Sequence, residues 1–214
     1  MKKIIPLFIA FQLFFISLLA QTGSLPPVDK SPMDMSYYPN NYPVLMIQDK
    51  MTEPLVARVI YSRPQKAGRT IFGSLVKYGE VWRMGANEAT EVEFFKPVKI
   101  GDKKIPKGRY TLYAITNENN WIIILNKNID TWGSFKYDQK KDLVRTTVAV
   151  QKTDIPIESL AMAFEKTATG CNLIIAWENI KVALPVPFKI LLDEIYKFNT
   201  AAFILFSFPA VLQQ

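Results

Sequence analysis

The residues of this chain that are best suited to chemistry gather between Tyr61 and Thr90. The charged side chains at the centre of this cluster are Arg63, Arg69, Arg83, Glu80 and Glu88. An isolated buried charge is very costly, so these groups must pair with one another, reach water or meet a ligand. A guanidinium fork can hold both oxygens of a carboxylate or phosphate at once. The stretch is therefore the first candidate for a ligand site.

Two arrangements of these charges are open. In the first, Arg83 pairs with Glu80 or Glu88 and braces a corner rich in glycine, and every arginine is satisfied inside the protein. In the second, a polar cleft forms with Trp82 or Tyr78 as its floor and presents exposed aromatic rings. The lining of that cleft is expected to be Arg63, Arg69, Arg83, Asn87 and Glu88.

Glu80 and Glu88 also offer the pair of carboxylates that glycoside hydrolysis uses. That reaction needs the two carboxyl groups about 5 to 9.5 Å apart, and one of them must stay protonated as the general acid. Nearby arginines favour the ionised carboxylate, which works against a general acid. A glycan hydrolase that depends on these two glutamates is the alternative function.

Missing residue types exclude several kinds of chemistry. The chain contains no histidine and one cysteine, Cys171. Ser-His-Asp and Cys-His catalysis, imidazole metal ligands and an internal disulfide are therefore excluded. Asn126, Asn128 and Asp130 alternate as oxygen ligands for calcium do, but they lack the glycine and the distal glutamate of an EF-hand loop. We expect no metal and no cofactor.

The charge of the chain is mildly basic. The formal net charge is +7, and it falls to +5 without residues 1–20, which contain two lysines and no acid. The lysines are scattered, and pairs such as Lys103-Lys104 lie in polar segments. Nucleic-acid binding needs a concentrated basic stripe or a known module, so we expect no nucleic-acid partner. The ligands that suit the candidate cleft are a glycan, a peptide or a small anion.

The segment from Asn126 to Asp142 is too polar for a strand and too long for a simple turn. Loops of this length in compact domains are often functional or cover another part of the protein. Its aromatic residues can pack under the loop as a small core of their own. Alternatively, Trp132 and Tyr137 can form a stacking platform for a sugar ring.

Short β-branched or aromatic segments bounded by turn residues dominate the middle of the chain. The expected strands are 58–62, 90–95, 109–116, 121–125, 143–150, 160–164, 173–177 and 180–186. Tyr110, Leu112 and Ala114 alternate with other residues and share one face of a strand. The pattern predicts an all-β, antiparallel, jelly-roll-like sandwich.

The two ends of the chain differ from this middle part. Residues 1–20 have the charged start, apolar run and small Ala20 of a secretory signal peptide, which predicts export to the periplasm, the outer envelope or the medium. Residues 21–43 are expected to form an extended arm that is laid along the domain of residues 44–187 or left mobile, and their tyrosines favour the first. Residues 188–214 are apolar and can begin as a short amphipathic helix. They are short for a membrane span, so we expect an extra element packed on the domain, with a peripheral membrane contact or a non-native end of the reading frame as alternatives.

Six long motifs make the chain similar to a known family. They are SRPQKAGRTIFGSLV at 62–76, YGEVWRMGANEAT at 78–90, IPKGRYTLYAI at 105–115, WIIILNK at 121–127, WGSFKYD at 132–138 and LIIAWEN at 173–179. The chain resembles the DUF2911 proteins, an uncharacterised family of secreted or envelope proteins of Bacteroidetes-type bacteria. The resemblance implies fold and export, but no reaction.

These observations lead to one hypothesis about function. The chain is expected to be an exported β-sandwich that acts as a binding or structural module of the bacterial envelope rather than as an enzyme. A mature chain without a transmembrane span is expected. Neither the ligand nor the oligomeric state follows from the sequence.

Overall fold

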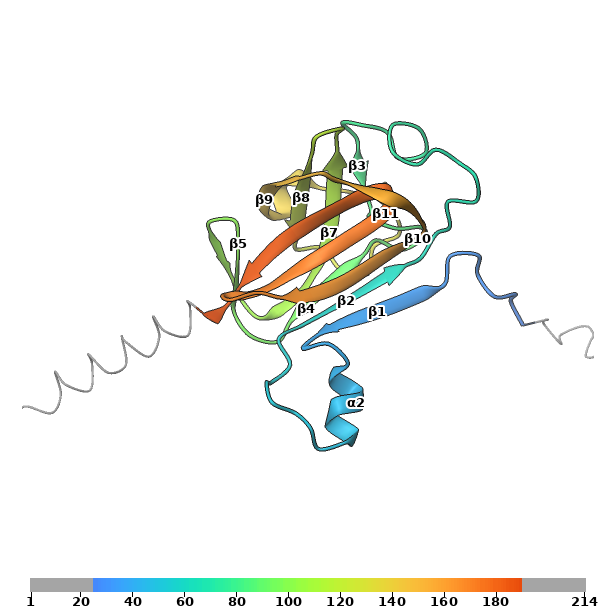
Figure 1. The fold of residues 1–214 in the computed structure, drawn as a ribbon. Helices are drawn as coiled ribbons and strands as arrows, with labels where there is room; N and C mark the ends of the chain where they lie inside the picture. The colour runs from blue at the N-terminus through green and yellow to red at the C-terminus, as the bar shows by residue number, and fades with distance from the viewer. Residues whose placement is uncertain (1–24, 190–214) are drawn as a thin grey trace, which may run out of the picture.

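The computed structural model describes residues 25–189, which fold into two layers of antiparallel β-structure (Figure 1). The elements in chain order are β1 (Met33–Tyr38), α2 (Tyr42–Ile47), β2 (Ala57–Ser62), β3 (Val81–Trp82), β4 (Glu91–Phe94), β5 (Val98–Ile100), β6 (Lys103–Ile105), β7 (Gly108–Thr116), β8 (Asn120–Asn126), η1 (Gln139–Lys141), β9 (Asp142–Ala149), β10 (Gln151–Lys166) and β11 (Gly170–Pro187). The predicted all-β antiparallel fold is confirmed.

The first layer is a sheet of seven strands in the order β1-β2-β4-β7-β8-β9, with β3 also paired to β7. The second layer is the long β10-β11 hairpin, which lies across one face of this sheet (Figure 1). β5 and β6 form a separate small hairpin. β3 pairs with β7 at Ile115 and Ala114, and β4 pairs with β7 from Thr111 to Gly108. The chain between β3 and β4 must therefore turn beside β7.

The main core lies between the two layers. Alternation along β7 sends Tyr110, Leu112 and Ala114 into it, as the sequence predicts. Several large aromatic rings meet there. Trp82 stacks on Trp177 with ring centroids 6.1 Å apart, and both rings are almost completely buried. The aromatic core therefore extends up to the turn that follows β3.

The opposite face of the large sheet is covered in part by the long loop before β9. Tyr113 and Ile124 are buried there, and Tyr137 from the loop packs against them. Tyr113 and Tyr137 have ring centroids 5.1 Å apart in an edge-on arrangement. The loop therefore supplies a second small core on this face of the sheet.

Several boundaries differ from those expected. The segments 173–177 and 180–186 form one strand, β11, which bends at Glu178 where φ is 55°. Part of the expected arm is strand β1, which pairs with β2 along its whole length. The short helix α2 follows it and had no counterpart in the sequence analysis. Residues 1–24 and 190–214, with the expected signal peptide and nearly all of the C-terminal extension, lie outside the described residues.

Candidate functional site

The turn between β3 and β4 fixes the backbone around Arg83. Met84 has a φ of 59°, which is uncommon for a residue other than glycine, and its side chain is fully buried. Thr90 donates its amide to the carbonyl of Arg83 at 3.0 Å and its hydroxyl to the carbonyl of Met84 at 2.9 Å. The Ser62 hydroxyl bonds the amide and the carbonyl of Ala86, each at 2.6 Å. These contacts hold the turn on both sides.

Arg83 itself is half-buried and has no acidic partner. Within residues 25–189 no carboxylate forms an ion pair with it, and its buried Nε has no hydrogen-bond acceptor. Burial alone lowers the pKa of its guanidinium below the ordinary value. Arg58 also has a buried Nε without an acceptor, but its Nη2 lies 2.5 Å from Glu93 Oε2. A desolvated cation without a counter-charge is costly, so the position of Arg83 needs an explanation.

Arg83 lies on the wall of a hollow with a volume of about 240 Å³, here called the Arg83 pocket. The lining consists of Ser31, Pro64, Arg69, Leu75, Val76, Trp82, Arg83, Gly85, Ala86 and Trp177. Two of these side chains are cations, and none of the described lining residues is acidic. The pocket therefore combines positive charge, one hydroxyl and two tryptophan rings that continue into the core.

A second hollow of about 190 Å³ adjoins the first and shares Leu75, Val76, Trp82 and Arg83 with it. Its remaining lining includes Lys77, Glu80 and Ser134. Glu80 is exposed and lies 3.8 Å from Lys77 Nζ, so its charge is already balanced in part by a neighbour. Arg83 thus lines both hollows, and a ligand can reach it from either one.

The other two arginines of the opening stretch are satisfied by the protein. Arg63 forms an ion pair with Asp34 at 3.0 Å, donates from Nε to the carbonyl of Leu160, and lines neither hollow. Arg69 lines the Arg83 pocket, but its guanidinium donates to the carbonyls of Lys66 and Gln65 in its own turn. A carbonyl oxygen accepts a hydrogen bond but carries no net negative charge, so Arg69 still contributes positive charge to the pocket.

Asn87 and Glu88 follow Arg83 closely in sequence but lie elsewhere. The Asn87 side chain donates to Asp29 at 3.1 Å. Glu88 is exposed and lines a different hollow of about 150 Å³, together with Glu91 and Asp130. The positive φ of Asn87, 58°, marks the point where the chain turns away from the pocket.

Trp132 and Tyr137 do not form one stacking platform. The Trp132 side chain is 61% exposed, and its backbone bridges to Glu88. Tyr137 is part of the small core under the loop, where its hydroxyl donates to Asp142 and accepts from Arg145, each at 2.6 Å. Burial and the hydrogen bond to Asp142 raise the pKa of Tyr137 to about 12. Neither ring lines the Arg83 pocket, although Ser134 of the same loop reaches the adjoining hollow.

The cleft expected from the sequence is therefore assembled only in part. Arg69, Trp82 and Arg83 come together, and Glu80 lines the adjoining hollow. The expected pairing of Arg83 with Glu80 or Glu88 is absent among the described residues. Glu80 and Glu88 line different hollows, so the two carboxylates of the hydrolase hypothesis do not share a pocket.

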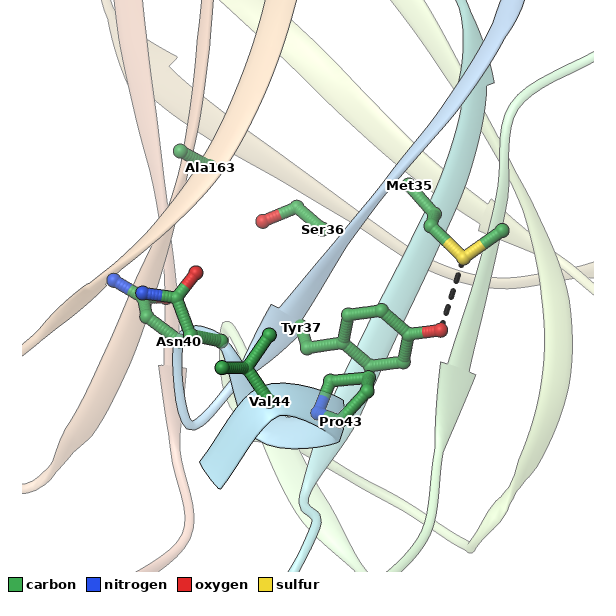
Figure 2. A pocket seen from close by; sticks show the side chains of 8 residues that line it. Met35, Ser36, Tyr37, Asn40, Pro43, Val44 and Ala163 are labelled. Atoms are coloured by element: carbon green, nitrogen blue, oxygen red, sulfur yellow. Dashed lines mark hydrogen bonds between the residues drawn. The ribbon is translucent and has the colours of Figure 1, made fainter. Parts of the chain in front are cut away.

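Sequence analysis missed two groups of residues around hollows. Ser31 and Trp177 complete the Arg83 pocket from parts of the chain far from Arg83. A hollow of about 470 Å³ lies between β1, α2 and β10 (Figure 2). Its lining consists of Met35, Ser36, Tyr37, Asn40, Asn41, Pro43, Val44 and Ala163. Since the described lining of this hollow carries no charge, it has no means of attracting an anion.

Residues 45–186 match a family model described as a protein of unknown function (DUF2911). The chain belongs to the DUF2911 family. The family region includes the turn that carries Arg83 and every residue of the Arg83 pocket except Ser31. No curated protein matches the chain, and no solved structure matches it.

Within residues 25–189, no helix is long and apolar enough to cross a membrane. No group of three or more Cys, Asp or Glu side chains in the same part is placed to hold a metal ion. The alternating residues Asn126 and Asp130 have protein partners, since Asn126 donates to Asp142 and Asp130 pairs with Arg109.

Proposed function

We propose that this DUF2911 protein is an exported binding module that holds a small anionic ligand in the Arg83 pocket. One observation carries the proposal. Arg83 is a half-buried guanidinium without an acidic partner among the described residues, and it opens into a pocket with a second uncompensated arginine. A bound carboxylate, phosphate or sulfate supplies the negative charge and the hydrogen-bond acceptors that the described residues do not provide for Arg83.

The dimensions of the pocket limit the ligand. Pockets for drug-sized molecules have volumes of about 300 to 1,000 Å³. The Arg83 pocket, at about 240 Å³, is smaller. The expected ligand is therefore an anionic group on a body no larger than one ring, such as a uronic acid or a sugar phosphate. The edges of Trp82 and Trp177 provide apolar contact for that body.

The rigidity of the site supports binding. The turn that carries Arg83 is held by Ser62 and Thr90 before any ligand arrives, so little backbone entropy is lost on binding. Residues 1–20, with the features of a signal peptide, support a location in the envelope or outside the cell. No observation favours the hydrolase alternative.

A ligand panel tests the proposal. The full chain is screened by thermal shift against uronic acids, sugar phosphates, short peptides and the matching neutral sugars, and hits are measured by titration calorimetry. Arg83→Gln is compared with Arg63→Gln, which removes a charge from the same stretch but lies outside both hollows. We expect Arg83→Gln to weaken the anion about 10- to 100-fold, as the loss of a charged hydrogen bond does.

Two results would overturn this function. The first is a panel in which no anion raises the unfolding temperature above the effect of its neutral counterpart. The second is an anion that binds Arg83→Gln as tightly as the unchanged protein. Equal losses in Arg83→Gln and Arg63→Gln would show that general charge, rather than the pocket, attracts the anion.

A further inference from the structure

The outer edge of β1 is unpaired in the part of the chain that the structure describes. β1 is the terminal strand of the large sheet and pairs only with β2. Pro32 and Pro39 flank it and limit it to six residues. An unpaired edge presents a row of backbone donors and acceptors that can pair with another extended chain.

The register shows which backbone groups point outward. Arg63 donates its amide to the carbonyl of Pro32, so that pair is hydrogen-bonded. Hydrogen-bonded pairs alternate along an antiparallel ladder, which places Asp34 and Ser36 in bonded pairs with β2. The backbone groups of Met35 and Tyr37 therefore point away from the sheet. In agreement, the Met35 amide is held by the adjacent Asp34 side chain at 2.8 Å.

The edge also borders the hollow of about 470 Å³ between β1, α2 and β10. Figure 2 shows Ser36, Asn40 and Val44 on the side of β1 that faces Ala163 of β10, with Tyr37 and Met35 across the strand. Side chains of β2 close the other end of this gap, since Tyr61 donates to the carbonyl of Met162 at 3.3 Å. The hollow thus lies between β1 and Ala163 of β10.

We infer that this hollow, the edge hollow, binds an extended, neutral peptide segment of a partner protein, which adds to β1 as a further strand. Outward backbone groups at alternate residues are complementary to an extended backbone and to no compact ligand. The absence of charged side chains in the described lining favours uncharged residues on the side that enters the hollow. Met35 and Val44, about half exposed, supply apolar contact at the rim.

The occupant is a different ligand from the one proposed for the Arg83 pocket, because the two hollows share no lining residue. The volume of the edge hollow, about 470 Å³, suits a few side chains of a peptide. A strand of six residues sets the length of the ladder that can form. Main-chain hydrogen bonds provide the affinity, and the hollow selects the side chains at alternate positions.

A selection experiment with matched variants tests the inference. The full chain is panned against a phage-displayed random peptide library, and the selected sequence is synthesised as a hexapeptide. Binding is measured by fluorescence anisotropy to the unchanged protein, to Ala163→Arg and to Ala149→Arg. Both alanines are exposed strand residues, but only Ala163 lines the edge hollow. We expect Ala163→Arg to weaken binding about tenfold or more, and Ala149→Arg to leave it unchanged.

The mode of binding has its own readout. N-methylation of the peptide at successive residues should reduce binding at alternate positions only, because every second amide of an added strand faces β1. Amide exchange of Tyr37 should slow when the peptide binds, whereas the Met35 amide is already held by Asp34. A selected peptide that is insensitive to Ala163→Arg, or an N-methyl series without alternation, overturns the inference. So does a selection that yields no peptide while the chain forms dimers that Ala163→Arg dissociates, since a second copy then occupies the edge.

Discussion

Arg83 and Arg145 are two arginines near the same long loop, and their surroundings are opposite, since Arg83 is half-buried and Arg145 is exposed. Arg145 donates to Asp142 at 2.8 Å and to the Tyr137 hydroxyl at 2.6 Å. Burial lowers the pKa of Arg145, but these hydrogen bonds outweigh it and the pKa is raised. Burial acts alone on Arg83, and its pKa is lowered. The sequence analysis offered both Arg83 and Tyr137 as candidate ligand contacts, and only Arg83 lines a pocket in the structure.

The difference indicates how to distinguish a structural charge from a binding charge. The network of Asp142, Tyr137 and Arg145 satisfies its own donors and acceptors, so it stabilises the covering loop and needs no ligand. Arg83 keeps a cost of desolvation that no described neighbour offsets. Unsatisfied buried groups that persist in native proteins cluster at functional sites. The unpaired Arg83 therefore indicates the ligand site, and the paired Arg145 does not.

The largest expected effect on stability is at Asp142. Its side chain is 9% exposed and accepts hydrogen bonds from Asn126, Tyr137 and Arg145. Asp142→Ala leaves Arg145 without its counter-charge and should lower the free energy of unfolding by about 3 kcal/mol, measured by urea denaturation. Anion binding at the Arg83 pocket should be unchanged. A loss within about 0.5 kcal/mol, as for an ordinary surface substitution, would show that the network contributes little.

A smaller effect is expected at alkaline pH. The pKa of Tyr137 is raised from 10.0 to about 12, mainly by burial. Between these values the unfolded chain releases the phenolic proton and the folded chain keeps it, so stability is full below pH 10 and falls as pH rises towards 12. Tyr137→Phe should make this fall shallower in urea unfolding measured across that range. A remaining slope is expected, because the pKa of Tyr38 is also raised to about 12, mainly by burial. Identical slopes in both proteins would contradict this assignment.

Local patterns were sufficient to predict most of the fold. Alternation in β7 depends on neighbouring residues, and the structure confirms that Tyr110, Leu112 and Ala114 share its core face. The interruption at Glu178 was expected as a break between two strands, but β11 continues through it, because one residue with a positive φ changes the backbone locally without ending the strand. β1 was described as an arm because its partner, β2, lies beyond α2 in the sequence.

The candidate site was less accessible to sequence analysis. The proximity of Trp82 and Arg83 follows from their adjacency, but Ser31 and Trp177 reach the pocket through long-range packing. Arg63 was misplaced for the same reason, since its partner Asp34 lies on β1. Sequence can show that charges must be satisfied, but the partner of each charge depends on strand pairing between distant segments.

The measurement that tests the account most directly is the stability and anion binding of Arg83→Met, with Arg63→Met as the matched control. Methionine retains much of the volume of arginine and removes the unpaired charge, so Arg83→Met should raise the free energy of unfolding by about 1 kcal/mol and abolish binding. Arg63→Met loses an ion pair and a carbonyl bond, so it should be destabilised and still bind. If Arg83→Met is instead less stable than the unchanged protein, Arg83 is a structural residue and the proposed ligand site is wrong.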